Sequence, residues 1–74
     1  MMLVERLLRL GSHTVRCVVV DHAEGWEVRE ERDSVVLRDA IRGDWHRVER
    51  DLLLFDGRAA VLRQQGWNDE ARLT

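Results

Sequence analysis

The chain has 74 residues, of which 45% are hydrophobic and 35% charged, and its formal net charge is -2 at pH 7. This length allows one domain, which buries only about 60% of the surface that its unfolded chain exposes and is therefore marginally stable alone. The single cysteine cannot form an internal disulfide, and the three histidines lack the spacing of a zinc motif. The remaining way to stabilise so small a fold is oligomerisation.

Every one of the twelve positive charges is an arginine. Arginine suits bidentate contacts to phosphate or carboxylate. We attribute the bias instead to GC-rich, bacterial-like coding DNA, because fourteen acidic residues balance the arginines and no basic block stands out. Apolar runs reach only four residues, which predicts neither a signal peptide nor a membrane span. The lone cysteine fits a reducing, cytoplasmic location.

The first segment, residues 2–10, fits two structures. Its leucines lie on one helical arc, which would give a short helix ending at Gly11. We expect a strand, because Gly11 and Ser12 form a connection of hairpin length and a fourth strand widens a sheet that three short strands would leave narrow. A short helix over residues 2–10 is the alternative prediction.

Three further strands are predicted between turn signals near residues 11–12, 23–25, 33–34 and 43–44. The valine-rich segment 14–21 is the clearest strand. Segment 26–31 alternates, with Trp26 and Val28 on one face and charged residues on the other, as in a half-buried antiparallel strand. In segment 35–42 the same alternation places Val35, Leu37 and Ile41 on one face and Val36, Arg38, Ala40 and Arg42 on the other.

A long helix is predicted from Asp44 to about Gly66. Apolar residues recur there at alternating spacings of three and four, the period of a helix with one buried face: Trp45, Val48, Leu52, Phe55, Ala59 and Leu62. The Asp44 carboxylate suits the cap of the first turn. The dipeptide Asp56-Gly57 is a hairpin signal, but the apolar stripe passes through it without a change of phase, so we predict one continuous helix.

The same helix carries a second set of apolar or small residues away from this stripe, namely Leu53, Leu54, Gly57, Ala60 and Val61. A helix packed on one sheet needs only one apolar face. We therefore expect the second face to contact the same helix of another subunit across a two-fold axis, with Gly57 and Ala60 allowing close approach. The alternatives are that these residues are simply exposed, or that segment 2–10 covers them.

Few residues carry chemistry, and they are scattered. The histidines fall in turns or in the first turn of the helix, at positions His13, His22 and His46. Metal-ligand atoms gather only at one hairpin, on Asp21, His22 and Glu24, which we interpret as solvated turn residues. Cys17 is expected between Val15 and Val19 as a small buried thiol. We predict no catalytic residue, no metal site and no cofactor.

The tryptophans are interpreted as structural. Trp26 and Trp45 are predicted to face the core, and Trp67 to fold back and seal the end of the helix. The single domain is expected to span residues 1–67. The polar tail, residues 68–74, is expected to fray.

A sheet face bearing Arg16, Arg38 and Arg42 among acidic residues allows a competing function. Four strands followed by a helix are similar in topology to the Whirly and PUR modules, and this likeness of element order alone implies binding of single-stranded nucleic acid. Such a surface needs exposed aromatic residues for base stacking, whereas the outward positions here offer valines. The interleaved charges are more typical of cross-strand ion pairs on a solvated face.

The sequence thus predicts a small α+β domain of type ββββα, in which an antiparallel meander of three to four strands is covered on one face by a long C-terminal helix. The expected function is a non-catalytic binding or protein-interaction module, homodimeric through that helix, with a different protein as a further partner and no membrane contact. Single-stranded nucleic-acid binding is the first alternative. The second is a small enzyme whose site, shared between subunits, brings His46 of one near an acidic residue of the other.

Overall fold

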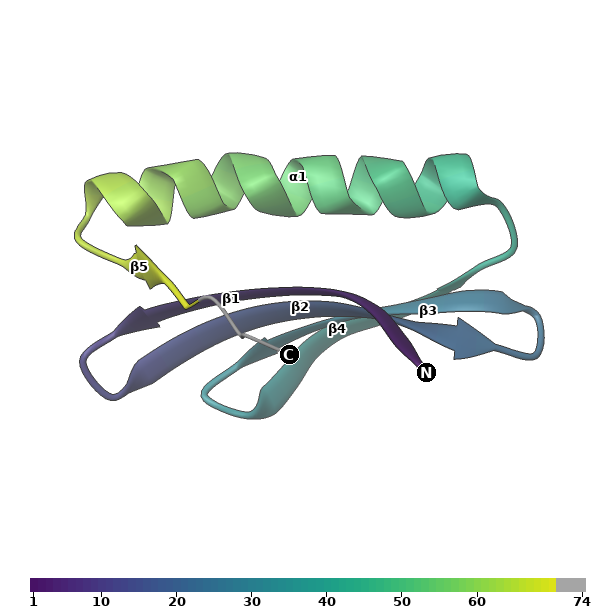
Figure 1. Ribbon diagram of the computed structural model, residues 1–74, viewed down its shortest axis with the longest axis horizontal. Coiled ribbons are helices and arrows are strands. Elements are labelled where there is room, and N and C mark those ends of the chain that lie inside the picture. Colours follow the sequence, from purple (N-terminus) through teal and green to yellow (C-terminus); the bar gives the residue numbers. More distant parts are fainter. Residues whose placement is uncertain (71–74) are drawn as a thin grey trace.

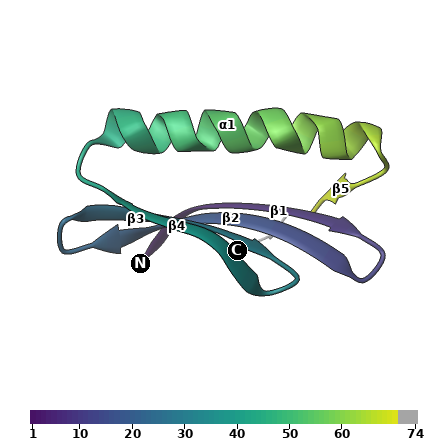
Figure 2. The ribbon, with the colours of Figure 1, turned by 180° about the vertical axis from the view of Figure 1, so that it is seen from behind.

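The computed structural model describes residues 1–70. The elements in chain order are β1 (Met2–Leu10), β2 (His13–His22), β3 (Gly25–Arg32), β4 (Val35–Arg42), the helix α1 (Trp45–Gln64) and the short β5 (Asn68–Asp69). The strands form one antiparallel sheet in the order β4-β3-β2-β1-β5. Helix α1 lies lengthwise over one face of this sheet and leaves the other face open (Figures 1 and 2). The predicted ββββα arrangement is confirmed, including a strand rather than a helix at β1.

The core lies between α1 and the sheet. It is built from inward residues of β1, β2 and β3, from the apolar stripe of α1 and from one tryptophan beyond the helix: Leu8, Cys17, Val19, Val28, Val48, Phe55, Ala59 and Trp67. Leu52 and Leu62 pack against it. Trp26 and Trp45 meet edge to face at the other end of the layer, with ring centroids 5.2 Å apart. From Val48 to Leu62 the predicted stripe therefore faces the core, whereas Trp45 at its start is 37% exposed.

Strand β4 departs from the simple alternation expected of it. Arg38 lies opposite Glu30 and Val36 lies opposite Glu31, so Leu37 is an extra residue in a β-bulge. The bulge shifts the phase by one residue. The grouping predicted for segment 35–42 was therefore wrong. The residues of β4 on the helix side of the sheet are Val35, Arg38, Ala40 and Arg42, and those on the open side are Val36, Asp39 and Ile41.

The start of α1 is fixed by Asp44, as predicted. Its Oδ1 accepts a hydrogen bond of 2.9 Å from the His46 amide. We expect Asp44→Ala to lower the free energy of unfolding by about 1 kcal/mol, because the first-turn amides lose their acceptor. Urea unfolding followed by tryptophan fluorescence measures this. Asp44→Asn keeps an acceptor and should lose less than half as much; an equal loss in both variants would contradict a capping role.

The end of α1 follows from Gly66, which adopts a φ of +101°. The Trp67 amide donates to the Leu62 carbonyl at 3.1 Å and the Gly66 amide to the Arg63 carbonyl at 3.1 Å, the two bonds of a Schellman motif. This turn directs Trp67 back into the core, where it is buried. The predicted sealing of the helix end by Trp67 is confirmed.

The polar tail was expected to begin at Asn68, and here the structure differs. Asn68 and Asp69 pair with Arg9 and Leu8 of β1, and the Glu70 amide donates to the Leu7 carbonyl at 2.9 Å. Residues 68–70 lie at the β1 edge of the sheet because Trp67, immediately before them, is buried in the core. Residues 71–74 of the predicted tail lie outside the described residues.

Candidate interaction surface

The second set of helix residues lies exposed on the side of α1 away from the core. We call Leu53, Leu54, Gly57, Ala60 and Val61 the outer face of α1; all five are exposed. Three of them are large and apolar, with exposed fractions of 73% for Leu53, 56% for Leu54 and 53% for Val61. Strand β1 does not cover them, because it pairs within the sheet on the other side of the core. Within residues 1–70 this apolar surface is unpartnered.

Gly57 stands in the middle of the outer face. A Cβ added there would meet no atom within 4 Å. Glycine inside a helix is about 1 kcal/mol less favourable than alanine, and no packing among the described residues requires it. The absence of a side chain at the centre of an apolar face would allow another helix to approach closely.

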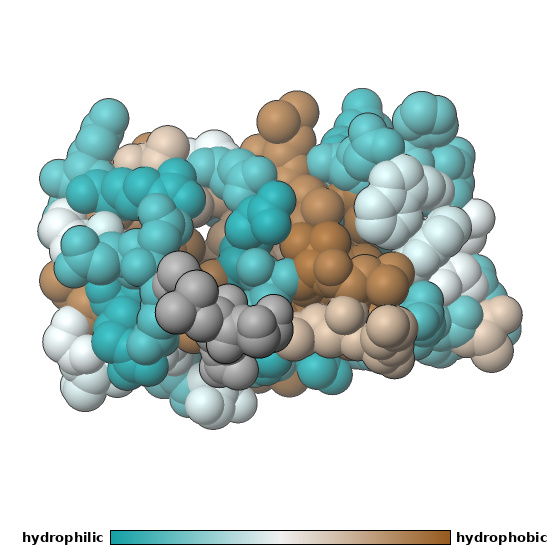
Figure 3. All heavy atoms as spheres, viewed as in Figure 1, coloured by the Kyte–Doolittle hydropathy of each residue, from teal (hydrophilic) through white to brown (hydrophobic). Residues whose placement is uncertain are grey.

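Exposed apolar surface also reaches the flank of the molecule. Figure 3 shows a hydrophobic band that runs from the helix down to the level of the sheet, between hydrophilic areas on either side. The molecule thus exposes hydrophobic side chains beyond the top of α1, among them Met2 and Leu3 at the start of β1.

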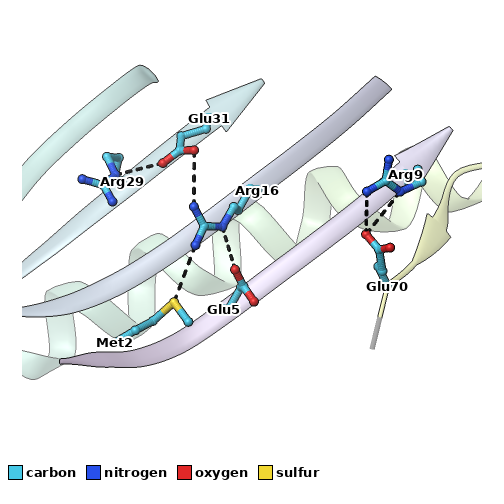
Figure 4. Close-up of polar contacts among 7 residues, drawn as sticks. All are labelled: Met2, Glu5, Arg9, Arg16, Arg29, Glu31 and Glu70. Atoms are coloured by element: carbon cyan, nitrogen blue, oxygen red, sulfur yellow. Dashed lines mark hydrogen bonds and ion pairs between the residues drawn. The ribbon is translucent and has the colours of Figure 1, made fainter. Parts of the chain in front are cut away.

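The open face of the sheet carries a network centred on Arg16 (Figure 4). Arg16 Nε donates to Glu5 at 2.6 Å and its Nη1 to Glu31 at 3.4 Å, while Arg29 Nε donates to the same Glu31 at 3.0 Å. The hydrogen bond to Glu5 raises the pKa of Arg16 above its usual value. Val18, flanked by Glu5 and Arg29 in the register, is fully buried on this face. The guanidinium of Arg16 is therefore already held by carboxylates.

The other two arginines of the nucleic-acid alternative lie elsewhere. Because of the bulge, Arg38 and Arg42 lie on the helix side of the sheet. Arg42 forms a two-bond ion pair with Asp51 of α1, at 2.8 and 3.2 Å, which raises its pKa. Arg16, Arg38 and Arg42 therefore do not share a face, and the expected arginine-bearing sheet surface is not formed.

Two of the histidines, His13 and His22, make polar contacts within or near their own turns. His13 Nδ1 lies 3.1 Å from Asp33 Oδ2, and the Glu24 amide donates to His22 Nδ1 at 3.1 Å. The Thr14 amide and His13 together lower the pKa of Asp33, in the turn between β3 and β4. Among residues 1–70 no group of three or more His, Cys, Asp or Glu side chains is placed to hold a metal ion.

Cys17 is fully buried in the core, as predicted. Burial raises the pKa of its thiol to about 11, with a smaller contribution from the charge of Glu30. A thiol with this pKa is protonated at neutral pH and is a poor nucleophile. Cys17 therefore acts as a small apolar core residue.

This thiol makes alkaline stability testable, because the chain has no Lys and no Tyr and no other side chain titrates between pH 9 and 12. Above a pKa of 9.0 the unfolded chain loses the Cys17 proton, while the folded chain keeps it to about pH 11. The free energy of unfolding should therefore fall by about 3 kcal/mol as pH rises through this window. Urea titrations at several pH values measure the slope. Cys17→Ala should abolish it; an unchanged slope would show another cause.

One concave surface was missed by the sequence reasoning. A hollow of about 420 Å³ lies between the last half of α1 and β4, with Phe55 and Leu62 of α1 and Leu37 of β4 among its lining residues. Along the helix toward Arg47 the hollow narrows to a depression of about 10 Å³ beside Leu54 and then opens into a second hollow of about 160 Å³, each sharing lining residues with its neighbour. We call this the α1–β4 groove. The sequence did not predict this groove because the groove involves the β-bulge at Leu37, and the alternation of residues along β4 does not reveal a bulge.

Comparisons with known proteins give no match: no family model fits the chain, and no curated protein or solved structure matches it. Among the described residues, no helix is both long and apolar enough to cross a membrane. Function therefore has to be inferred from the surfaces described above.

Proposed function

We propose that this protein is a small non-catalytic protein-interaction module that forms a homodimer through the outer face of α1. The observation that carries the proposal is the exposed, unpartnered apolar face of α1, with Leu53 73% exposed and a bare Gly57 beside it. An isologous contact places the same patch on both subunits, so a face that is apolar along a helix can pair with itself.

The residue sizes along the outer face support such a pairing. Leu53, Gly57 and Ala60 follow one another at spacings of four and three, so they form a short stripe with its smallest residue in the middle. In an antiparallel crossing at Gly57, the leucine of each copy would lie near the alanine of the other. Leu54 and Val61 would lie at the margin of this contact. Large against small is the combination that fills a helix interface without strain.

The two alternatives have less support. Base stacking needs exposed aromatic residues among unpaired arginines, and on the open sheet face Arg16 is held by Glu5 and Glu31. A shared active site would need His46, which is exposed at the start of α1, and no feature of residues 1–70 points to a carboxylate that another subunit would bring to it. The observations on the outer face of α1 therefore favour the interaction module.

The test is the molar mass in solution, measured by light scattering behind a sizing column over a range of concentrations. The unmodified chain, of 8.7 kDa, should elute at twice that mass. Gly57→Leu and Leu53→Asp should each weaken the dimer by at least about tenfold in Kd, because the first blocks close approach and the second buries a charge.

A matched control separates the contact from folding. Val36 is an exposed apolar residue on the open side of β4, and Val36→Asp makes the same kind of change away from α1. It should leave the dimer intact. A monomeric unmodified chain at every concentration would overturn the proposal, and so would a dimer that Gly57→Leu and Leu53→Asp leave unchanged.

A further inference from the structure

The helix layer of this protein covers only part of its sheet. One helix is about 10 Å wide and strands lie about 4.8 Å apart, so a single helix covers roughly two strands. The buried core takes residues from β1, β2 and β3, and none from β4. On the helix side of β4, Val35 is 62% exposed and the bulged Leu37 is 66% exposed. The α1–β4 groove lies over this uncovered strand.

The two walls of the groove are apolar toward its middle. Leu54 and Val61 of α1 line it from above, and Ala40 and Leu37 of β4 line it from below. Leu54 and Val61 are seven residues apart, which is two helical turns, or about 10 Å along the axis. That spacing matches the repeat of apolar residues along one side of a second helix.

The rim of the groove is positively charged. Its arginines are Arg32, Arg38, Arg42, Arg47, Arg50 and Arg58, and its acidic residues are Glu30 and Asp51. Both carboxylates are already paired, Glu30 with Arg58 and Asp51 with Arg42. Four arginines of the rim therefore make no ion pair within residues 1–70. An excess of positive charge along a concave apolar surface favours an acidic, amphipathic partner.

We propose that the α1–β4 groove binds an acidic amphipathic helix of another protein, which lies beside α1 and completes the helix layer over β4. Its apolar side chains would pack between Leu54, Val61 and Leu37, and its carboxylates would meet the unpaired arginines of the rim. The groove shares Leu54 and Val61 with the margin of the dimer contact, but the residues at the centre of that contact, Leu53, Gly57 and Ala60, line no part of the groove.

Other occupants fit the groove less well. A second copy presenting the same groove would bring arginine against arginine, which is unfavourable. A single-stranded nucleic acid would match the charge, but the exposed apolar residues of the groove are Leu37, Leu54 and Val61, and the aromatic residue that lines it, Phe55, is buried and offers no ring for stacking. The combination of aliphatic walls and an arginine rim selects a partner that is both apolar and acidic.

The experiment uses fluorescein-labelled helical peptides of about 18 residues, with leucines at spacings of three and four and glutamates flanking them. Fluorescence anisotropy measures their binding to the full chain. The glutamate peptide should bind at least about tenfold more tightly than the same peptide with lysine in place of glutamate, and its affinity should fall with added salt.

Three variants locate the site. Leu37→Asp, and separately the double variant Arg47→Gln with Arg50→Gln, should each weaken binding of the glutamate peptide by at least about tenfold. The matched charge control, Arg6→Gln with Arg9→Gln, removes two arginines from β1 and should bind as the unmodified chain does. Circular dichroism and urea unfolding show that each variant is folded.

The outcomes distinguish this site from the dimer. Leu53→Asp should bind the glutamate peptide normally even where it is monomeric, so failure of one proposal leaves the other testable. Equal binding of the glutamate and lysine peptides, or no loss of binding in the groove variants, would overturn the inference. So would tighter binding of a labelled oligothymidine than of the glutamate peptide through the same arginines.

Discussion

Phe55→Ala is expected to lower the free energy of unfolding by about 3–5 kcal/mol. Phe55 is 3% exposed and packs at the centre of the core, where α1 faces β2 and β3. Removing the ring loses the favourable free energy of transferring it from water into the core. It also leaves a cavity that so small a core cannot fill. A domain of this length has about 4–11 kcal/mol in total. Urea unfolding, followed by tryptophan fluorescence and circular dichroism, should show a much earlier midpoint or no folded baseline.

Phe55→Leu is the matched control. It keeps most of the buried hydrophobic volume, so the loss should stay below about 1.5 kcal/mol. If Phe55→Ala were no more harmful than Phe55→Leu, α1 would not be held to the sheet by this side chain, and the packing described between the two layers would be wrong.

Gly25→Ala is expected to lower the free energy of unfolding by about 3 kcal/mol or more. Gly25 begins β3 with a φ of +132°, a conformation that strains any other residue. An added Cβ would also collide with the Arg42 carbonyl oxygen and lie 2.9 Å from the Gly43 Cα. Both are backbone atoms where the chain leaves β4 for α1, so relief requires the helix connection to move.

Gly11→Ala separates the two parts of this effect. Gly11 also has a positive φ, of +58°, but a Cβ there meets nothing within 4 Å. Its loss should be limited to backbone strain, about 1 kcal/mol. Urea unfolding of both variants measures the difference. Equal losses at Gly11 and Gly25 would show that the close approach of Gly25 to the connection between β4 and α1 is unimportant.

Much of the fold follows from local signals in the sequence. The helix is specified by its apolar stripe, by the cap at Asp44 and by Gly66, and these agree strongly enough that Asp56-Gly57 does not interrupt it. The hairpins follow from short turns such as Gly11-Ser12 and Asp33-Ser34; φ is positive at Gly11 in the first turn and at both Asp33 and Ser34 in the second. Each signal involves neighbours in the chain, which is why it can be recognised without the structure.

The features that sequence reasoning missed depend on contacts between distant segments. The bulge at Leu37 is set by the pairing of β4 with β3, and it transfers Arg38 and Arg42 from the open face to the helix side. The strand at Asn68 forms because the Schellman turn places Trp67 in the core beside β1. Alternation along one segment contains neither piece of information.

The two candidate surfaces differ in the same respect: one depends on a single helix and the other on contacts between distant segments. The outer face of α1 is a property of one helix, so its five residues were predicted, and the structure places all of them in solvent. The α1–β4 groove needs the helix, the bulged strand and their relative position together. Its arginines are spread from Arg32 to Arg58 in the sequence and look like unremarkable surface charge until the fold gathers them.

Disulfide trapping at Gly57 tests the central claim, that the outer face of α1 meets its own copy. In a Cys17→Ala background, Gly57→Cys introduces a single thiol at the centre of the proposed contact, and Glu24→Cys introduces one in the exposed turn between β2 and β3. Cysteines bridge only when their Cα atoms come within about 7 Å. Mild oxidation should convert the Gly57→Cys chain to a covalent dimer much faster than the Glu24→Cys chain. Equal rates, or no covalent dimer from Gly57→Cys, would contradict the claim.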